Sequence, residues 1–165
     1  MFRPSDHILI IFGASGDLTA RKLIPALFHL HCDGHLPGNF AVLGVSRSSF
    51  TDEEFRKKVV YESTYLNGDT KARGPEKAKS FAEKLFYHDL GSTYEDSYVA
   101  LASRIKNLNS QYETGDNFIF YLSTPPNIYE VIARNQLNAF HVRQLSQLNN
   151  AEVDRKVAEI WGPIK

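Results

Sequence analysis

The stretch His7-Ile-Leu-Ile-Ile-Phe-Gly-Ala-Ser-Gly-Asp-Leu-Thr-Ala-Arg-Lys22 decides the fold of this 165-residue chain. Its first six residues form a short apolar run, rich in β-branched side chains and stopped by glycine, which predicts a buried strand. From Asp17 leucines recur at helical intervals, so we expect a helix with Pro25 as an irregularity in an early turn and Asp33-Gly34 at its end. A buried strand that turns directly into a helix is typical of a parallel α/β sheet.

The turn between this strand and this helix is suited to binding phosphate. Gly13 permits a tight turn, and Gly16 lets an anion approach the backbone. The unpaired amides and the positive dipole end of the helix then face the anion. The spacing is Gly-x-x-Gly rather than the standard Gly-x-Gly-x-x-Gly, and no Gly-Lys-Ser/Thr follows, so the turn is not a P-loop. A plain strand-to-helix turn without a ligand remains the alternative at this point.

Three further apolar runs have the length and composition of buried strands. They are Phe40–Ser46, Phe86–Leu90 and Asn117–Leu122. Their alternation with helices predicts an α/β fold, a partial Rossmann-like parallel sheet of about four strands with flanking helices. In the strand order 3-2-1-4-5-6 of such sheets, the fourth strand is an apolar edge unless another segment covers it.

The helices between these strands are marked by their first residues. Thr51 with Glu54 matches a capping box and opens a helix to about Leu66, and Ser92 with Glu95 is a second capping box. Residues 67–69 and 73–75 are loop signals, and Pro75 is well placed to begin a short helix through Leu85. We expect one Rossmann-like domain over residues 1–135. A helical tail, 136–165, follows it, rich in Gln and Asn and without a further strand.

The end of the second strand distinguishes between the two nicotinamide dinucleotides. An NAD site places a carboxylate there for the ribose hydroxyls, whereas NADP needs a cation for its 2′-phosphate. This strand is followed by Arg47, with Ser15 and Ser46 as hydroxyl donors, and no carboxylate occurs before Asp52. NADP is therefore the predicted cofactor. A solvated loop arginine is the alternative interpretation of Arg47.

Three ordered motifs narrow this prediction to one family. They are the run from Ile11 to Phe28, Gly44-Val-Ser-Arg47 and Phe120-Tyr-Leu-Ser-Thr-Pro-Pro126. Together they resemble the N-terminal, NADP-binding domain of the glucose-6-phosphate dehydrogenase family, from about Ile8 to Arg134. One departure is Thr19, where the family more often has alanine.

The resemblance implies a dehydrogenase of the pentose phosphate pathway of glucose metabolism, which passes hydride from C1 of glucose 6-phosphate to NADP. It places the pyrophosphate at the glycine turn, the 2′-phosphate at Arg47 with Ser15, the adenosine end at the third strand and the nicotinamide half at the fourth. The implied cofactor-binding residues are Gly13, Ala14, Ser15, Gly16, Asp17, Leu18, Arg47, Asp89, Leu90, Ser123, Thr124 and Pro125.

The catalytic motifs of the family do not occur in this sequence. By the resemblance, the histidine that removes the hydroxyl proton lies in Arg-Ile-Asp-His-Tyr-Leu-Gly-Lys, and Glu-Lys-Pro orients substrate and cofactor. We therefore assign no catalytic residue and expect a truncated chain, inactive alone and lacking the family's dimer interface. Glucose 6-phosphate is expected to bind only with the missing domain supplied in trans. The alternative is a free-standing NADP-binding module or a non-catalytic remnant.

Other candidate sites carry less weight. His29, His31, Cys32 and His35 suggest zinc, but helical spacing divides them between two faces, so the polar end of a helix is favoured. His88 lies nearest the expected cofactor cleft, and we expect it to be structural. A short-chain dehydrogenase needs Tyr-x-x-x-Lys, and none of the eight tyrosines has lysine four residues later.

Composition limits the remaining possibilities. Lys plus Arg equals Asp plus Glu at 19 each, so no bulk charge favours nucleic acid or a membrane surface as a partner. A single cysteine, Cys32, allows no intramolecular disulfide, which fits a reducing compartment. The longest apolar run is too short to span a bilayer, and it lacks the pattern of a signal peptide. We expect a cytoplasmic protein.

Overall fold

The computed structural model describes residues 4–91 and 94–135. They form a four-stranded sheet in the order β3-β2-β1-β4, and every neighbouring pair of strands is parallel. The strands are β1 (His7–Phe12), β2 (Phe40–Ser46), β3 (Leu85–Asp89) and β4 (Phe118–Leu122). The α/β parallel sheet that the sequence predicted is confirmed, with each strand within a residue of its expected position.

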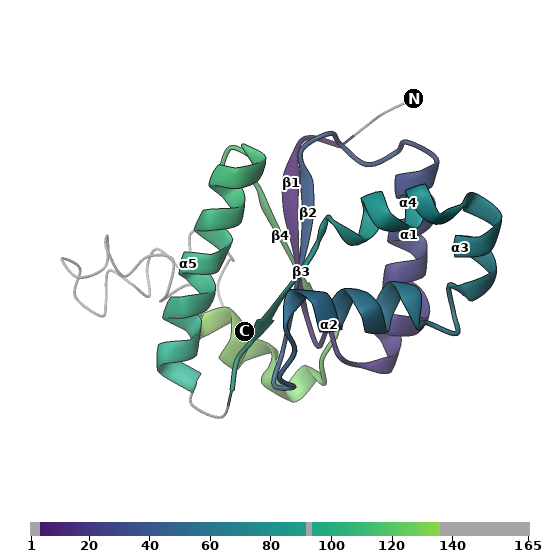
Figure 1. Cartoon of the computed structure of the whole chain (residues 1–165). Coiled ribbons are helices and arrows are strands. Elements are labelled where there is room, and N and C mark those ends of the chain that lie inside the picture. The colour runs from purple at the N-terminus through teal and green to yellow at the C-terminus, as the bar shows by residue number, and fades with distance from the viewer. Residues whose placement is uncertain (1–3, 92–93, 136–165) are drawn as a thin grey trace.

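Helices cover both faces of this sheet. Figure 1 shows the sheet nearly edge-on, with α1 to α4 on one side and α5 on the other. The helices are α1 (Ile24–Cys32), α2 (Asp52–Arg56), α3 (Asn67–Arg73), α4 (Pro75–Ala82) and α5 (Tyr94–Tyr112), and residues 129–135 are also helical. None of the helices in the described ranges is long and apolar enough to cross a membrane.

Each face of the sheet has its own hydrophobic core. On the α1–α4 face, Phe28, Phe55 and Phe81 belong to a cluster with residues of β1, β2 and β3. On the α5 face, Leu101 and Ile105 contribute to the cluster over the opposite side. The two cores use alternate residues of the same strands, which is why the strand runs are apolar throughout.

Pro25 accounts for the irregular start of the first helix. Residues Thr19–Leu23 form a π-helical turn before α1. The Ile24 N–H donates to the carbonyl of Thr19, five residues earlier, instead of to that of Ala20, as in an α-helix. Since proline has no N–H, the ordinary bond at Pro25 is absent, and the wider turn absorbs this gap. The irregularity expected in this helix is therefore a π-turn.

Two expectations for residues 62–74 are wrong. The helix that starts at the Thr51 capping box ends with the π-helical turn Lys57–Tyr61 rather than at Leu66, and residues 67–69 are helical instead of a loop. Burial of Leu66 fixes the start of α3, and the Thr70 hydroxyl donates to the Leu66 carbonyl at 3.0 Å. Tertiary packing thus overrides the weak local preference of Asn67-Gly68. The second capping box and the tail 136–165 lie outside the described residues.

Candidate functional site

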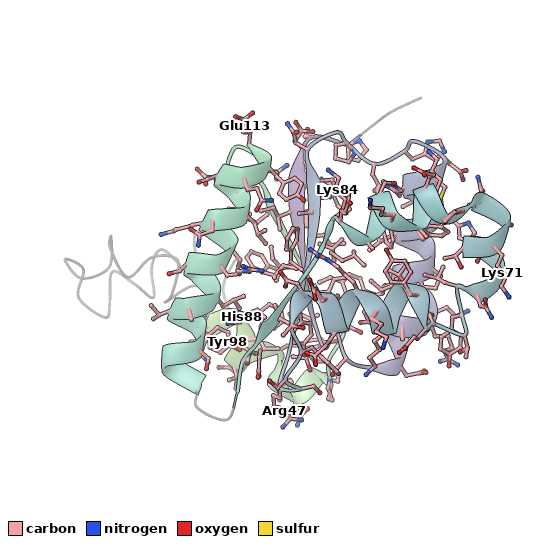
Figure 2. All side chains as sticks on the ribbon, in the orientation of Figure 1. Arg47, Lys71, Lys84, His88, Tyr98 and Glu113 are labelled. Carbon is pink, nitrogen blue, oxygen red and sulfur yellow. The ribbon has the colours of Figure 1, made fainter. Side chains whose placement is uncertain are left out.

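The residues predicted to bind the cofactor lie at the carboxyl ends of the strands. Asp89 is the last residue of β3 and the others follow a strand, so they gather at one end of the parallel sheet. Figure 2 shows Arg47 at this lower end of the molecule and Glu113, which precedes β4, at the opposite end. The strand order switches at β1, because β2 and β3 are added on one side of it and β4 on the other. Ligands of open α/β sheets bind at such a switch point.

Gly13 closes the contact between β1 and β4 at this switch point. Its φ is +83°, and a Cβ on it would lie 2.1 Å from the Ser123 carbonyl oxygen. Its N–H and that of Ala14 both donate to the Val45 carbonyl, at 2.9 and 3.2 Å. Any side chain at position 13 would push apart the first and fourth strand ends, so glycine is required there on two independent grounds.

The backbone of the turn leaves an anion-binding surface open. The Gly16 N–H turns back to the Gly13 carbonyl at 3.0 Å and is therefore used within the turn. Hydrogen bonds within the described residues do not use the N–H groups of Ser15, Asp17 and Leu18, and residues 16–18 are exposed. These three amides lie at the positive end of the first helix, where they are suited to the oxygens of a pyrophosphate.

Thr19 stabilises the turn, a role that sequence reasoning did not assign. Its side chain is fully buried, its hydroxyl donates to the Gly13 carbonyl at 3.2 Å, and its oxygen lies 3.5 Å from the Ser123 hydroxyl oxygen. The alanine that the resemblance leads us to expect here has no hydroxyl. The motif itself carried no signal for this role, because both partners become neighbours only on folding.

Thr124 provides a polar atom that a ligand can satisfy. Its Oγ1 is buried and has no hydrogen-bond partner among the described residues, while its Cγ2 lies against Gly13. A buried hydroxyl without a partner is costly, and a bound polar ligand removes this cost. This orphan atom, at the end of β4 beside the glycine turn, is a feature that fits a bound dinucleotide.

Arg47 lies beside a cluster of three serine hydroxyls. The Ser15 and Ser46 hydroxyls are 2.6 Å apart, and the Ser48 hydroxyl donates to that of Ser15 at 3.2 Å. Arg47 itself is exposed and makes no ion pair or hydrogen bond with any residue that the structure describes. A loop that presents a guanidinium without a protein partner and several rotatable hydroxyls is suited to a phosphate dianion.

The remaining predicted residues occupy three different environments. The Asp89 carboxylate accepts a hydrogen bond from the Gly91 N–H at 2.6 Å and caps the turn after β3. The Leu90 side chain is buried in the α5-side core, so only its backbone borders the site. Pro125 is exposed and precedes the 3₁₀ turn Pro126–Ile128, beside the end of β4.

The His88 side chain is partly buried and hydrogen-bonded to α5. Its Nε2 lies 3.3 Å from the Ser97 carbonyl, and Figure 2 shows it between the sheet and α5. Burial, opposed by the hydrogen bond to Ser97, lowers the pKa of the His88 imidazole below its usual value. These contacts describe a structural histidine.

The histidines of the first helix contact separate partners. His29 Nε2 lies 3.2 Å from an Asp69 carboxylate oxygen, and His31 Nε2 lies 2.8 Å from the Ser80 hydroxyl. No group of three or more metal-ligating side chains converges among the described residues. The contacts instead connect α1 to α3 and α4.

Comparison with known proteins gives consistent matches. The model of the family "Glucose-6-phosphate dehydrogenase, NAD binding domain" matches residues 10–159. The glucose-6-phosphate 1-dehydrogenase of Treponema pallidum is 38% identical over 138 residues, which are 84% of this chain and 26% of the relative. That of Aggregatibacter actinomycetemcomitans is 41% identical over 124 residues, 75% of this chain and 24% of the relative.

Solved structures give the same result. A glucose-6-phosphate dehydrogenase in complex with its substrate glucose-6-phosphate aligns with a TM-score of 0.66 and 28% identity, covering 83% of this chain and 27% of that one. The enzyme of Mycobacterium avium aligns with a TM-score of 0.66 and 26% identity, covering 82% and 27%. The chain thus spans about a quarter of the length of the proteins it matches.

Proposed function

The chain belongs to the glucose-6-phosphate dehydrogenase family, whose cofactor is NADP, and carries its NAD binding domain, and we propose that it holds NADP with the glycine turn on the pyrophosphate and Arg47 on the 2′-phosphate. The observation that carries this proposal is the position of Arg47. An exposed cation beside three hydroxyls stands where an NAD-specific site has a carboxylate.

The parts of the cofactor meet groups that suit their charge and shape. The amides of Ser15, Asp17 and Leu18 face the pyrophosphate, and Gly13 lets the turn that carries them close against the end of β4. Thr124 offers its orphan hydroxyl beside the same glycine. Bound NADP would supply a hydride acceptor, and the residues of this chain would orient it.

Oxidation of glucose 6-phosphate is the reaction that we propose for the assembled site. The sequence contains neither of the family motifs that handle the sugar. We therefore propose that these 165 residues supply the cofactor half of the reaction, and that the sugar and its proton are handled by polypeptide such as the relatives carry beyond the matched region.

Binding measurements on the full chain test the cofactor assignment. Isothermal titration calorimetry should show binding of NADP and much weaker binding of NAD. Arg47→Ala should weaken NADP binding about 10- to 100-fold, since it removes a charge-assisted contact to the phosphate, and should leave NAD unchanged. Arg73→Ala is the matched control, because Arg73 pairs with Asp33 away from the site. Equal binding of NADP and NAD by the unaltered chain would refute the assignment.

A turnover assay tests whether this chain supplies only the cofactor half of the reaction. The purified chain with glucose 6-phosphate and NADP should form no NADPH, as followed by its absorbance. Measurable turnover, abolished by Arg47→Ala, would show that these residues also bind the sugar and supply a base.

A further inference from the structure

Tyr87 connects β3 to the loop that carries Arg47. Its hydroxyl donates to the Ser48 carbonyl at 2.7 Å, one residue beyond Arg47. Its backbone N–H donates to a carboxylate oxygen of Asp52, also at 2.7 Å, where α2 begins. Through one residue, β3 therefore fixes both ends of the segment between β2 and α2.

The ring of Tyr87 adds packing to these hydrogen bonds. It lies edge-on to Phe50 at 5.4 Å between ring centroids and against Phe55 at 4.9 Å. Burial raises the pKa of the Tyr87 hydroxyl, which accordingly stays protonated and able to donate. Phe50 belongs to the same loop as Arg47, so the ring holds the far part of that loop as well.

Arg47 depends on this support because its own side chain makes no contact that fixes it. The guanidinium has no hydrogen-bond or ion-pair partner among the described residues, so its position follows from the backbone of the loop. The Ser48 hydroxyl, which completes the serine cluster, lies on the residue whose carbonyl Tyr87 holds. Loss of that hydrogen bond would loosen two phosphate-facing groups together.

We propose that Tyr87 is a positioning residue for recognition of the 2′-phosphate, which acts by holding the Ser48 carbonyl and with it the loop of Arg47. Tyr87 sets how strongly the site prefers a ribose with a 2′-phosphate over one without. This inference rests on the proposed function, since it needs Arg47 to be the phosphate ligand.

Two small probes measure this preference directly. The compounds 2′,5′-ADP and 5′-AMP differ only in the 2′-phosphate, and calorimetry with the full chain gives the ratio of their affinities. Tyr87→Phe keeps the ring and removes the hydroxyl. The ratio should fall about 3- to 10-fold in this variant through weaker binding of 2′,5′-ADP, while binding of 5′-AMP is unchanged.

Tyr112→Phe is the matched control. Its hydroxyl also donates to a backbone carbonyl, that of Glu83 at 3.3 Å, but Glu83 precedes β3 and so lies at the other end of the sheet. This variant should keep the affinity ratio of the unaltered chain. A ratio that falls equally in both tyrosine variants would mean a general loss of stability and would overturn the inference.

A second variant reaches the same loop without the hydrogen bond. Phe50→Ala removes the ring that packs on Tyr87, is only partly buried, and should lower the ratio in the same direction. If the unaltered chain discriminates between the probes and the ratio is undiminished in both Tyr87→Phe and Phe50→Ala, the role of Tyr87 is excluded and the proposed NADP site remains. Unaltered chain that binds both probes equally would instead remove the proposed NADP site.

Discussion

The two outer strands of the sheet, β3 and β4, differ in how the rest of the protein covers them. At β3 the Leu85 carbonyl accepts a hydrogen bond from Arg56 Nε at 2.8 Å, and the Tyr87 N–H donates to Asp52 at 2.7 Å. The Leu85 side chain is fully buried. On the same face of β4, Ile119 is 45% exposed and Tyr121 is 41% exposed.

The path of the chain explains this difference. The connections from β1 to β2 and from β2 to β3 place α1 to α4 on one face (Figure 1). The buried strand residues of the core on that face belong to β1, β2 and β3. The connection from β3 back across to β4 runs through α5 on the opposite face, as right-handed crossovers require. The described connections therefore supply no helix to the α1 face of β4.

The comparison also bears on the site. The loop of Arg47 is connected to β3, the strand whose edge groups are hydrogen-bonded to α2. The glycine turn instead meets the end of β4, through Gly13 and Ser123. One part of the candidate site thus rests on a well-packed strand and the other on a strand with an exposed apolar face.

Truncation of matched aliphatic side chains on the two strands should give the largest effect. Leu85→Ala should lower the free energy of unfolding by about 3 kcal/mol, because it leaves a cavity in a fully buried position. Ile119→Ala on β4 should cost less than about 1 kcal/mol, because that side chain is already half in water. Urea denaturation measures both values. Similar losses would show that β4 is as well covered as β3.

Removal of the carboxylate that caps the β3 edge should have the next largest effect. Asp52 accepts from the Tyr87 N–H and pairs with Arg104 at 2.6 Å. Asp52→Ala should therefore lower the free energy of unfolding by about 2 kcal/mol, since it leaves a backbone donor and a guanidinium without their acceptor. Asp17→Ala is the control, because its ion pair with Arg21 is exposed and should be worth less than about 0.5 kcal/mol. Equal losses in the two variants would disprove a special role for the β3 edge.

Sequence reasoning succeeded where one local pattern decides the structure. The apolar runs predicted the strands, the glycine spacing predicted the turn after β1, and Thr51 with Glu54 forms the expected capping box. These features depend on residues that are close in sequence. The place of the apolar strand β4 at an edge of the sheet was also predicted, from the strand order that the alternation of strands and helices implies.

Contacts between distant residues were not predictable in this way. Three contacts join segments that meet only in the folded sheet. They are the Gly13–Ser123 contact, the hydrogen bond of the Thr19 hydroxyl to Gly13 and that of the Tyr87 hydroxyl to the Ser48 carbonyl. The helix over residues 67–73 was missed for the same reason, since burial of Leu66 outweighs the loop preference of Asn67-Gly68. These parts of the candidate site therefore depend on tertiary contacts that the local sequence does not reveal.

Acid should weaken the β3 side of the molecule through His88. Burial lowers the pKa of this imidazole below its usual value near 6.5, so the folded state favours the neutral form. Its contribution to stability is present above pH 6.5 and is lost as the pH falls through the lowered value, because the unfolded chain then binds more protons. The thermal midpoint should drop between pH 7.5 and 5, and less steeply in His88→Gln.

The nearby charges of Arg104 and Asp89 are retained in the His88→Gln variant. An unchanged slope would assign the acid sensitivity to other groups, such as His31, whose pKa burial also lowers.

Adding charge to β4 should change stability least and association most. Tyr121 shares its face with Ile119 and is 41% exposed, so the ammonium group of Tyr121→Lys can reach water. The free energy of unfolding should change by less than about 0.5 kcal/mol.

Apolar edge strands promote association between copies, and lysine is a common means of preventing it. Light scattering at increasing protein concentration should therefore show less association in Tyr121→Lys than in the unaltered chain. Val99→Lys is the control, because Val99 is also exposed to water, at 57%, and lies on α5 instead of the sheet. If Tyr121→Lys instead unfolds the protein while Val99→Lys does not, the outer face of β4 is packed against other parts of the chain, and the contrast between the two outer strands disappears.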